Sequence, residues 1–383
     1  MARVKLEDVC ERGSSNLKQS DVVDKDGDYP IYGASGYIGN VDFYHQEQPY
    51  VAVVKDGAGI GRTTLHPAKS SVIGTMQYLL PKGNVLPEYL CYVVKYMHLE
   101  KYFTGATIPH IYFKDYKNEE FNLDSLDRQK EIVSTLNKIE KVIESRTKEL
   151  ELLDELIRAR FVELFGNPLD GTAKYPIHQV GEVANSVDPQ PSHRTPPVEE
   201  GGIPYVSIKD CDYKTGKIDF EGARKVSPKV LEEHMNRYTL HDGDFVVGKI
   251  GTIGNPVFVP VRNDYTLSAN VVLIQPNSEL VSPYFLKYSF ESDFVERQFA
   301  EAKNSTSQAA FGIQKVRTVE VMNPDLDVQR EFEIFVKQVD KSKFDIHKFL
   351  YCTTHNTQSI IKPRPNTKES GKTRGGKLYA DEF

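Results

Sequence analysis

Residues Leu126–Phe165 read LDRQKEIVSTLNKIEKVIESRTKELELLDELIRARFVELF, a stretch without glycine or proline. Apolar side chains recur at alternating steps of four and three residues, which is the a/d seam of a left-handed coiled coil. Arg146 and Arg160 stand where the seam expects apolar residues. At 1.5 Å per residue the stretch predicts a helix of roughly 60 Å, long enough to hold two bodies apart. The alternative is a buried helix of one large domain. The seam comprises Ile132, Leu136, Ile139, Ile143, Leu150, Leu153, Ile157 and Leu164.

The segments around this helix occur twice in the same order. VVKDGAGIG from Val53 matches VVGKIGTIG from Val246, and LPEYLCYVV from Leu86 matches SPYFLKYSF from Ser282. LDRQKEI at the helix start matches LDVQREF, which begins at Leu326. We therefore expect a duplicated unit, each copy being a globular domain followed by a helix.

A second, shorter seam follows the second copy, in residues 326–350. A helix running back antiparallel to the first would let the two seams bury each other. The alternative is that the seams pack on helices of a partner. The second seam comprises Phe332, Val336, Val339, Ile346 and Leu350.

This pattern divides the chain into five segments and predicts a mixed α+β (α/β) fold. Strands are expected at Tyr50–Val54, Val72–Leu80 and Tyr265–Pro276, and helices at Pro87–Tyr102 and Ser282–Phe299. The tail is polar and basic, which predicts disorder. The segments are domain 1 (1–125), the first helix (126–165), domain 2 (166–325), the second helix (326–350) and the tail (351–383).

The composition is that of a globular protein long enough, at 383 residues, for two domains. A net charge of −6 disfavours a general nucleic-acid coat protein, but it permits a local basic face on DNA that a partner assists. The four cysteines form no CxxC pair, so we expect reduced thiols, no metal site and a cytoplasmic location. No apolar run has signal-peptide or membrane-spanning length, so no membrane contact is expected.

Motifs for catalysis are missing from the sequence. No GxxxxGK[ST] loop is present, and the glycines of Gly57–Gly61 have the wrong spacing for a dinucleotide site. Asn255-Pro-Val-Phe resembles the NPPF-type motif of DNA amino-methyltransferases, but it lacks the second proline, and no glycine-rich motif precedes it. We therefore expect no catalytic residue in this chain.

What remains is binding chemistry in paired loops. Lys and Arg can bind phosphates or guanine edges, Asn and Gln can bind adenine edges, and hydroxyl groups position the rest. Such loops are also ordinary on protein surfaces. The candidate DNA-binding residues are Lys55, Arg62, Thr63, Thr64, His110, Tyr112 and Lys114 in domain 1, and Lys249, Thr252, Asn255, Ser305, Thr306, Ser307, Gln308, Gln314 and Lys315 in domain 2.

Over nearly its whole length the chain resembles the specificity (S) subunit of type I restriction–modification systems. VKLEDVCE (Val4–Glu11) and YPIHQVGEVA (Tyr175–Ala184) are similar to the repeated domain starts of that family. GKIGTIG (Gly248–Gly254) resembles its turn after a strand. LDRQKEI and LDVQREF resemble its PLPPLxxQ helix start, with the prolines reduced to Pro324.

The resemblance implies two target recognition domains separated by two long antiparallel coiled-coil helices. Each domain would read one half of a split, asymmetric double-stranded DNA target, and the helices would act as a spacer. The chain would hold no cofactor and would dock two methyltransferase (M) subunits, which bind S-adenosylmethionine. Restriction (R) subunits would add cleavage that uses ATP and Mg²⁺. The competing interpretations are a coiled-coil scaffold that does not bind DNA and a self-contained methyltransferase.

Overall fold

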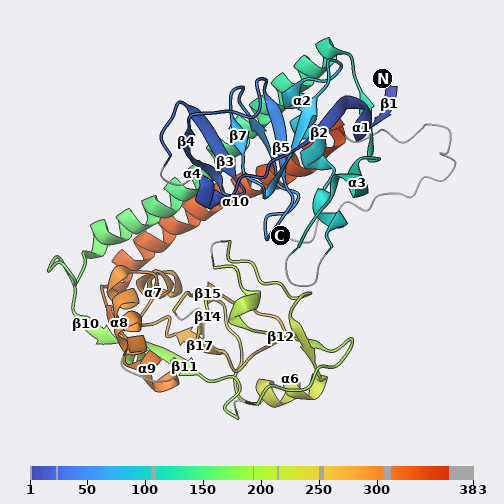
Figure 1. The fold of residues 1–383 in the computed structure, drawn as a ribbon. Coiled ribbons are helices and arrows are strands. Elements are labelled where there is room, and N and C mark those ends of the chain that lie inside the picture. The colour runs from blue at the N-terminus through green and yellow to red at the C-terminus, as the bar shows by residue number, and fades with distance from the viewer. Residues whose placement is uncertain are drawn as a thin grey trace. The chain divides into compact units, whose positions relative to one another are not determined.

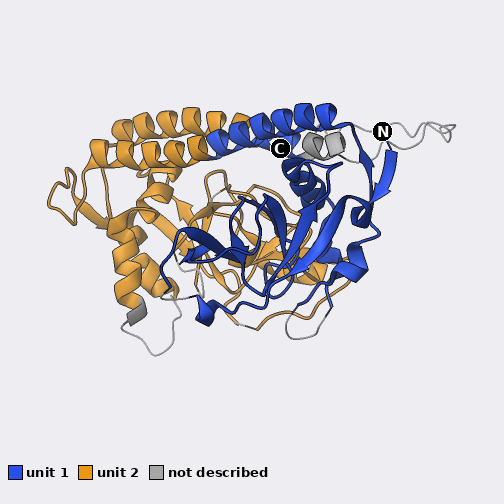
Figure 2. Ribbon diagram, turned by 45° about the horizontal axis from the view of Figure 1, so that its top comes forward, with its two compact units in different colours: residues 1–147, 347–383 blue, residues 148–346 orange. Residues whose placement is uncertain are grey.

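The computed structural model of the chain divides into two compact units (Figure 2). Unit 1 comprises residues 1–147 and 347–383, and unit 2 comprises residues 148–346. Both long helices, α4 (Leu126–Phe165) and α10 (Leu326–Ile361), which Figure 1 labels, contribute a segment to each unit (Figure 2). The structure describes residues 2–22, 25–104, 109–192, 194–213, 215–249, 254–304 and 312–361.

Unit 1 is built on a four-stranded and a three-stranded sheet. A short pair, β1–β9, joins its first residues to the segment before α4. The helices are α1 (Leu6–Val9), α2 (Pro87–Tyr96) and α3 (Phe113–Tyr116), with 3-10 turns η1 (Gln19–Asp21) and η2 (Leu99–Tyr102). The sheet orders are β2 (Cys10–Ser14), β8 (Met76–Pro81), β5 (Tyr50–Val54), β6 (Thr63–His66); β4 (Gly36–Val41), β3 (Tyr29–Gly33), β7 (Ser71–Val72); and β1 (Ala2–Lys5), β9 (Glu120–Leu123).

Unit 2 repeats this topology strand for strand, which confirms the duplication. Its helices are α5 (Val180–Val183), α6 (Pro228–Met235), α7 (Pro283–Phe290), α8 (Asp293–Asn304) and α9 (Ile313–Arg317), with the 3-10 turn η3 (Ile208–Asp210). The sheet orders are β11 (Ala184–Val187), β17 (Val271–Pro276), β14 (Phe245–Gly248), β15 (Val257–Phe258); β13 (Arg224–Val226), β12 (Ile203–Val206), β16 (Thr266–Leu267); and β10 (Ile177–Gln179), β18 (Glu320–Met322).

Two expected strands are each broken where the chain passes from one sheet to the other. Residues 72–80 leave the three-stranded sheet at β7 and enter the four-stranded sheet at β8. The turn between them contains Gly74, whose N–H donates to the carbonyl of Leu17 at 2.7 Å. Residues 265–276 make the same transfer from β16 to β17. An apolar run predicts burial, but it does not show that two different sheets supply it.

The expected helices also have different ends. The segment 87–102 ends as α2 at Tyr96, and His98 then adopts a left-handed conformation with φ +52°. The segment 282–299 divides into α7 and α8, and Ser292 accepts from the N–H of Val295 in the new first turn. α10 continues to Ile361 rather than ending at residue 350, because the first proline is Pro363. Residues 362–383 of the expected disordered tail lie outside the described residues.

Within unit 2, the segments of α4 and α10 run antiparallel, side by side (Figures 1 and 2). Asp154 pairs with Lys343 at 2.6 Å, whereas Arg160, further along α4, pairs with Glu331 at 2.6 Å. Residue numbers therefore rise on one helix as they fall on the other. In unit 1, the guanidinium of Arg146 lies over the Phe349 ring, 5.9 Å from its centroid.

Phenylalanines join the long helices of unit 2 to α7. Phe161 stacks on Phe285 of α7 at 5.6 Å and meets Phe332 of α10 edge-on at 5.4 Å. Phe165 also contacts Phe285, at 4.7 Å. Each such side chain stabilises the fold by about 1.5–3 kcal/mol when buried. α4 therefore belongs to the core of unit 2, together with Val336 and Val339 of the second seam.

The first seam changes its spacing near its end. The strict heptad places Arg160 toward the core, but the structure buries Phe161 instead. A straight helix drifts relative to a seven-residue repeat, so one step of four replaces a step of three. Arg160 then lies at the edge of the helix pair and bonds Glu163 and Glu331. On α10 the matching exception is Lys343, which bonds Asp154.

A buried glutamine fixes the first turn of each long helix. The Oε1 of Gln129 accepts from the N–H of Leu86, the residue that precedes α2, at 2.8 Å. Its Nε2 donates to the carbonyls of Asn84 at 3.0 Å and Asp124 at 2.9 Å. Gln129 thus ties the start of α4 to the start of α2.

Gln329 makes the same bonds in unit 2. Its Oε1 accepts from the N–H of Ser282 at 2.7 Å, and its Nε2 donates to the carbonyls of Pro324 at 2.7 Å and Leu280 at 3.5 Å. Both glutamines are fully buried. The Q shared by LDRQKEI and LDVQREF is therefore a structural residue in each copy.

Gln329→Ala should lower the free energy of unfolding of unit 2 by about 1–3 kcal/mol, because it leaves the Ser282 N–H buried without an acceptor. Urea unfolding followed by circular dichroism measures the loss, and amide exchange should accelerate at Ser282. Gln338→Ala, at an exposed position of the same helix, is the control. Equal effects of the two substitutions would contradict the role given to Gln329.

Candidate nucleic-acid interface

The two candidate loops of domain 1, far apart in sequence, meet in unit 1. The N–H of Ile111 donates to the carbonyl of Lys55 at 2.9 Å, and the N–H of Gly57 donates to the carbonyl of Pro109 at 3.0 Å. Both loops lie where β5 ends, and Gly57 has φ +94°, a conformation that favours glycine. The structure therefore makes one surface from two sequence signals.

Basic and aromatic side chains follow each other along this surface. His110 Nδ1 lies 2.7 Å from the carboxylate of Asp56, and Lys55 lies 4.0 Å from the same carboxylate. The ring of Tyr112 is exposed and stacks beside His110 at 6.5 Å, with the ammonium of Lys114 over it. This arrangement offers cations for phosphates and an aromatic face for a base or sugar.

The hydroxyls of Thr63 and Thr64 form hydrogen bonds within unit 1. Thr63 is buried and donates to the carbonyl of Gly61, and the Thr64 hydroxyl is 2.7 Å from Nε2 of His66. Burial lowers the pKa of His66 to about 4, so this ring is neutral at pH 7. Thr63 therefore supports the turn rather than forming part of the surface.

Arg62 is held against the turn between β3 and β4, a segment that contains none of the candidate residues. Its Nη1 donates to the carbonyl of Ala34, in the turn between β3 and β4, at 3.0 Å. Tyr37, just past that turn, is 62% exposed. The β3–β4 hairpin of the three-stranded sheet thus contacts Arg62 through its turn and carries an exposed aromatic side chain. The available sequence signal for this hairpin was the pair of tyrosines, Tyr32 and Tyr37, on either side of a glycine-containing turn.

In unit 2 the structure moves one candidate from the surface to the interior. Lys249 is only 5% exposed, and its ammonium lies 2.7 Å from the carboxylate of Asp188. Lys249 therefore holds the Asp188 segment and is not presented to solvent. The sequence suggested a surface loop because the residues after β14 are glycine-rich, and it could not indicate that Asp188 pairs with Lys249.

The remaining candidates of domain 2 are only partly described. Asn255 is half-buried after Gly254, which has φ +93° and no room for a Cβ because the Phe299 ring would be 2.7 Å away. Gln314 is exposed on α9, and the ammonium of Lys315 points inward. Thr252, Ser305, Thr306, Ser307 and Gln308 lie outside the described residues.

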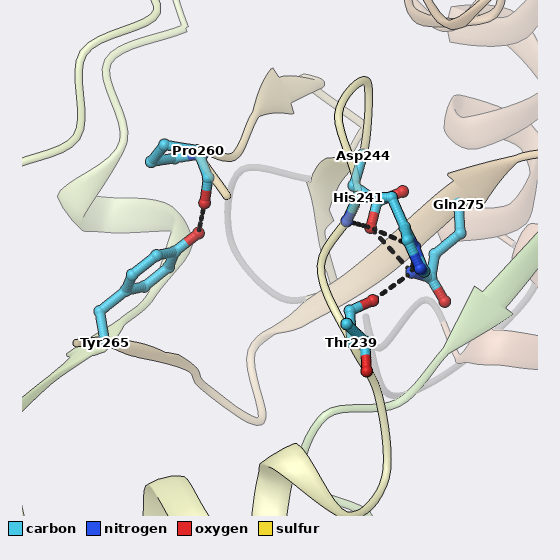
Figure 3. Close-up of polar contacts among 6 residues, drawn as sticks. All are labelled: Thr239, His241, Asp244, Pro260, Tyr265 and Gln275. Carbon is cyan, nitrogen blue, oxygen red and sulfur yellow. Dashed lines mark hydrogen bonds and ion pairs between the residues drawn. The ribbon is translucent and has the colours of Figure 1, made fainter. Parts of the chain in front are cut away.

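A polar network at the opposite end of β14 fixes this strand in its sheet (Figure 3). The Nε2 of Gln275 donates to the carbonyl of Thr239 at 2.9 Å and to the Asp244 carboxylate at 2.7 Å. The N–H of His241 also donates to Asp244 at 2.9 Å. Burial raises the pKa of Asp244, and these bonds oppose the shift. Tyr265 donates to the carbonyl of Pro260 at 2.8 Å, beyond β15. This network holds the start of β14 to β17.

Neither a metal cluster nor a membrane-spanning helix occurs in the described part of the chain. No group of three or more His, Cys, Asp or Glu side chains there could hold a metal ion. None of the helices found there is long and apolar enough to cross a membrane.

Comparison with known proteins matches both halves of the chain. The sequence model described as the type I restriction modification DNA specificity domain matches residues 1–155 and 174–351. The type I restriction enzyme MjaVIII specificity subunit of Methanocaldococcus jannaschii is 22% identical over 308 residues, which cover 76% of this chain and 72% of that protein.

Solved structures show the same fold at low identity. The crystal structure of a type I restriction-modification system S subunit from M. genitalium superposes with a TM-score of 0.55 at 14% identity, covering 94% of both chains. A chain from a study of complex assembly and conformational transition of the type I R-M system gives 0.53 at 13% identity, covering 94% of this chain and 96% of that one.

Asp188→Asn should destabilise unit 2 by about 3–5 kcal/mol, because it leaves the Lys249 ammonium buried without a counter-charge. Asp264→Asn is the matched control, since Asp264 pairs with Arg262 on the surface and should lose at most about 1 kcal/mol. Urea unfolding of both variants is the measurement. A small loss for Asp188→Asn would mean that Lys249 is accessible to water.

Proposed function

This chain belongs to the family of type I restriction–modification DNA specificity domains and carries two of them, and from that premise we propose that each domain reads one half of a bipartite DNA target. The chain is the specificity subunit of the enzyme and selects the sequence on which other subunits act. The domains correspond to residues 1–125 and 166–325, and residues 126–165 and 326–350 set the spacing between them.

The surface of unit 1 supports the assignment to DNA. Arg62 and Tyr112 are exposed on loops fixed by backbone hydrogen bonds, and Tyr37 at the start of β4 and Lys114 on α3 are exposed as well. Cations near aromatic rings suit a polyanion whose bases are also read. The net charge of −6 is compatible with this role if the partner subunits contribute further cations to the complex.

The long helices dock two methyltransferase (M) subunits. Many seam residues are used inside the chain: Ile157 is buried in the same core as Val336. The apolar side chains left outside are available to a partner. Leu152 and Leu156, one turn apart on α4, are 53% and 47% exposed, and Ile334 on α10 is 59% exposed. Exposed apolar residues on an otherwise charged helix suit a protein contact.

Chemistry is divided among the subunits. The M subunits supply S-adenosylmethionine and methylate adenine, and restriction (R) subunits add cleavage that uses ATP and Mg²⁺. This chain supplies the choice of double-stranded DNA sequence and the platform for assembly. This proposal rests on the duplicated strand topology, in which each copy of the globular domain is followed by a long helix.

Binding to DNA in the presence of M subunits tests the assignment directly. The complex should bind its target in preference to random DNA, with an affinity that falls as salt rises. A scaffold that does not bind DNA would show neither property. A self-contained methyltransferase would bind S-adenosylmethionine as the isolated chain, which calorimetry detects.

Exchange of residues 172–325 for the equivalent domain of a relative should change only one half of the methylated sequence. The reason is that each unit has its own sheets and loops, so one reader can be replaced alone. Methylation mapping across a genome is the measurement, with the unexchanged enzyme as the control. A change in both halves would contradict independent reading.

The double substitution Leu152→Glu, Leu156→Glu should weaken binding of the M subunit at least tenfold without lowering helical content, because both side chains are exposed. Glu151→Gln, Glu155→Gln at neighbouring exposed positions is the control. Titration calorimetry or gel filtration measures the complex. Unchanged binding of the leucine variant would place the M contact elsewhere.

A further inference from the structure

The proline-rich segment that follows β11 in unit 2, described over residues 188–192 and 194–197, is a surface loop attached through buried polar contacts. Asp188 pairs with the buried Lys249 at 2.7 Å. Arg224 donates from Nε and Nη2 to the carbonyl of Pro196, at 3.2 and 2.9 Å. A third contact, between these two, is made by the side chain of Gln190 with His234 on α6. The loop is therefore held at its start, middle and end.

The middle contact is the last link of a hydrogen-bond chain that begins in the sheet. The N–H of Leu267, on β16, donates to the hydroxyl of Tyr238 at 3.2 Å. That hydroxyl lies 3.0 Å from Oγ1 of Thr266, which lies 2.6 Å from Nδ1 of His234. On the other side of the ring, Nε2 lies 2.5 Å from Oε1 of Gln190.

One arrangement of protons satisfies every link. The amide nitrogen of Gln190 donates to the Ser192 hydroxyl at 2.8 Å and the Arg194 carbonyl at 3.3 Å, so its Oε1 must accept from Nε2–H of His234. Nδ1 then accepts from Thr266. Burial lowers the pKa of His234, helped by the nearby Arg237, so the neutral ring that the chain requires is the stable form.

The hydrogen-bond chain ends at an exposed loop tip that carries the side chain of Arg194. Ser192 and Arg194 are exposed, and Ser192 also accepts from the N–H of Arg194 at 3.4 Å. Within the described ranges the guanidinium of Arg194 has no ion-pair partner. A buried hydrogen-bond network that fixes the backbone at the tip of a loop suits a site that must present one side chain in a defined direction.

We propose that Pro191, Ser192, Arg194 and Thr195 form a preorganised DNA contact of unit 2, in which Arg194 binds a guanine edge and Gln190 and His234 are positioning residues. The inference rests on the proposed function. A guanine edge is favoured over a phosphate because bidentate bonding to O6 and N7 requires a fixed fork, whereas a phosphate accepts a mobile cation. The loop is equivalent to the β2–β3 connection of unit 1, since β11 and β12 match β2 and β3.

Arg194→Lys in the assembled methyltransferase separates these chemistries, because lysine keeps the charge and loses the fork. Genome-wide methylation mapping should show one guanine position relaxed, within one half of the target, with discrimination reduced about tenfold to a hundredfold. Gln190→Ala should relax the same position although Arg194 is intact. Arg297→Lys, on an exposed ion pair of α8, is the control and should change nothing.

The outcomes are distinct. If the wild-type complex methylates no defined sequence, the proposed function fails. If the wild type does so and Arg194→Lys methylates the same sequence to the same extent, the inference about this loop is wrong and the proposed function stands. Weaker methylation of an unchanged sequence by Arg194→Ala would assign Arg194 to a phosphate and also overturn base reading. Relaxation with Arg194→Lys but not with Gln190→Ala would remove the positioning role.

Discussion

The buried amide of Gln129, and its counterpart Gln329, is the contact on which each unit depends. Each amide bonds the first turn of a long helix to the residues that precede α2 or α7. Because the amide is removed from water, a missing partner would leave a polar group unsatisfied. The globular part and its helix are therefore not independent modules joined by a linker. The direction in which α4 or α10 leaves its unit is set by hydrogen bonds.

The helices themselves combine core packing with polar exceptions. Phe161 and Phe332 share an aromatic cluster with Phe285 of α7, while Arg160 and Lys343 are satisfied by carboxylates across the helix pair. Polar pairs at otherwise apolar positions fix register, because sliding one helix along the other would separate the charges. The same helices keep apolar side chains such as Leu156 on the outside, where the proposed M subunits can cover them.

The candidate DNA-contact surfaces of the two units show two ways of fixing a loop. In unit 1 two distant loops are joined by main-chain hydrogen bonds around Gly57. In unit 2 the loop after β11 is fixed by buried side chains, with Lys249 and His234 as interior anchors. A residue whose side chain suits DNA binding, such as Lys249, can thus support a surface loop from the interior. This division lets the same topology carry different readers, since the surface residues can change while the supports remain.

The sequence by itself determined the duplication, the two helices and the family, because these depend on local periodicity and on the order of short motifs. It also placed strand β5 and the start of α7 correctly. Only the tertiary structure decided that residues 72–80 serve two sheets, that Lys249 is interior and that the β3–β4 turn contacts Arg62. Each of these facts depends on a partner far away in the chain, as Asp188 is from Lys249. Periodicity records that a residue will be buried, whereas the folded chain decides against what it is buried.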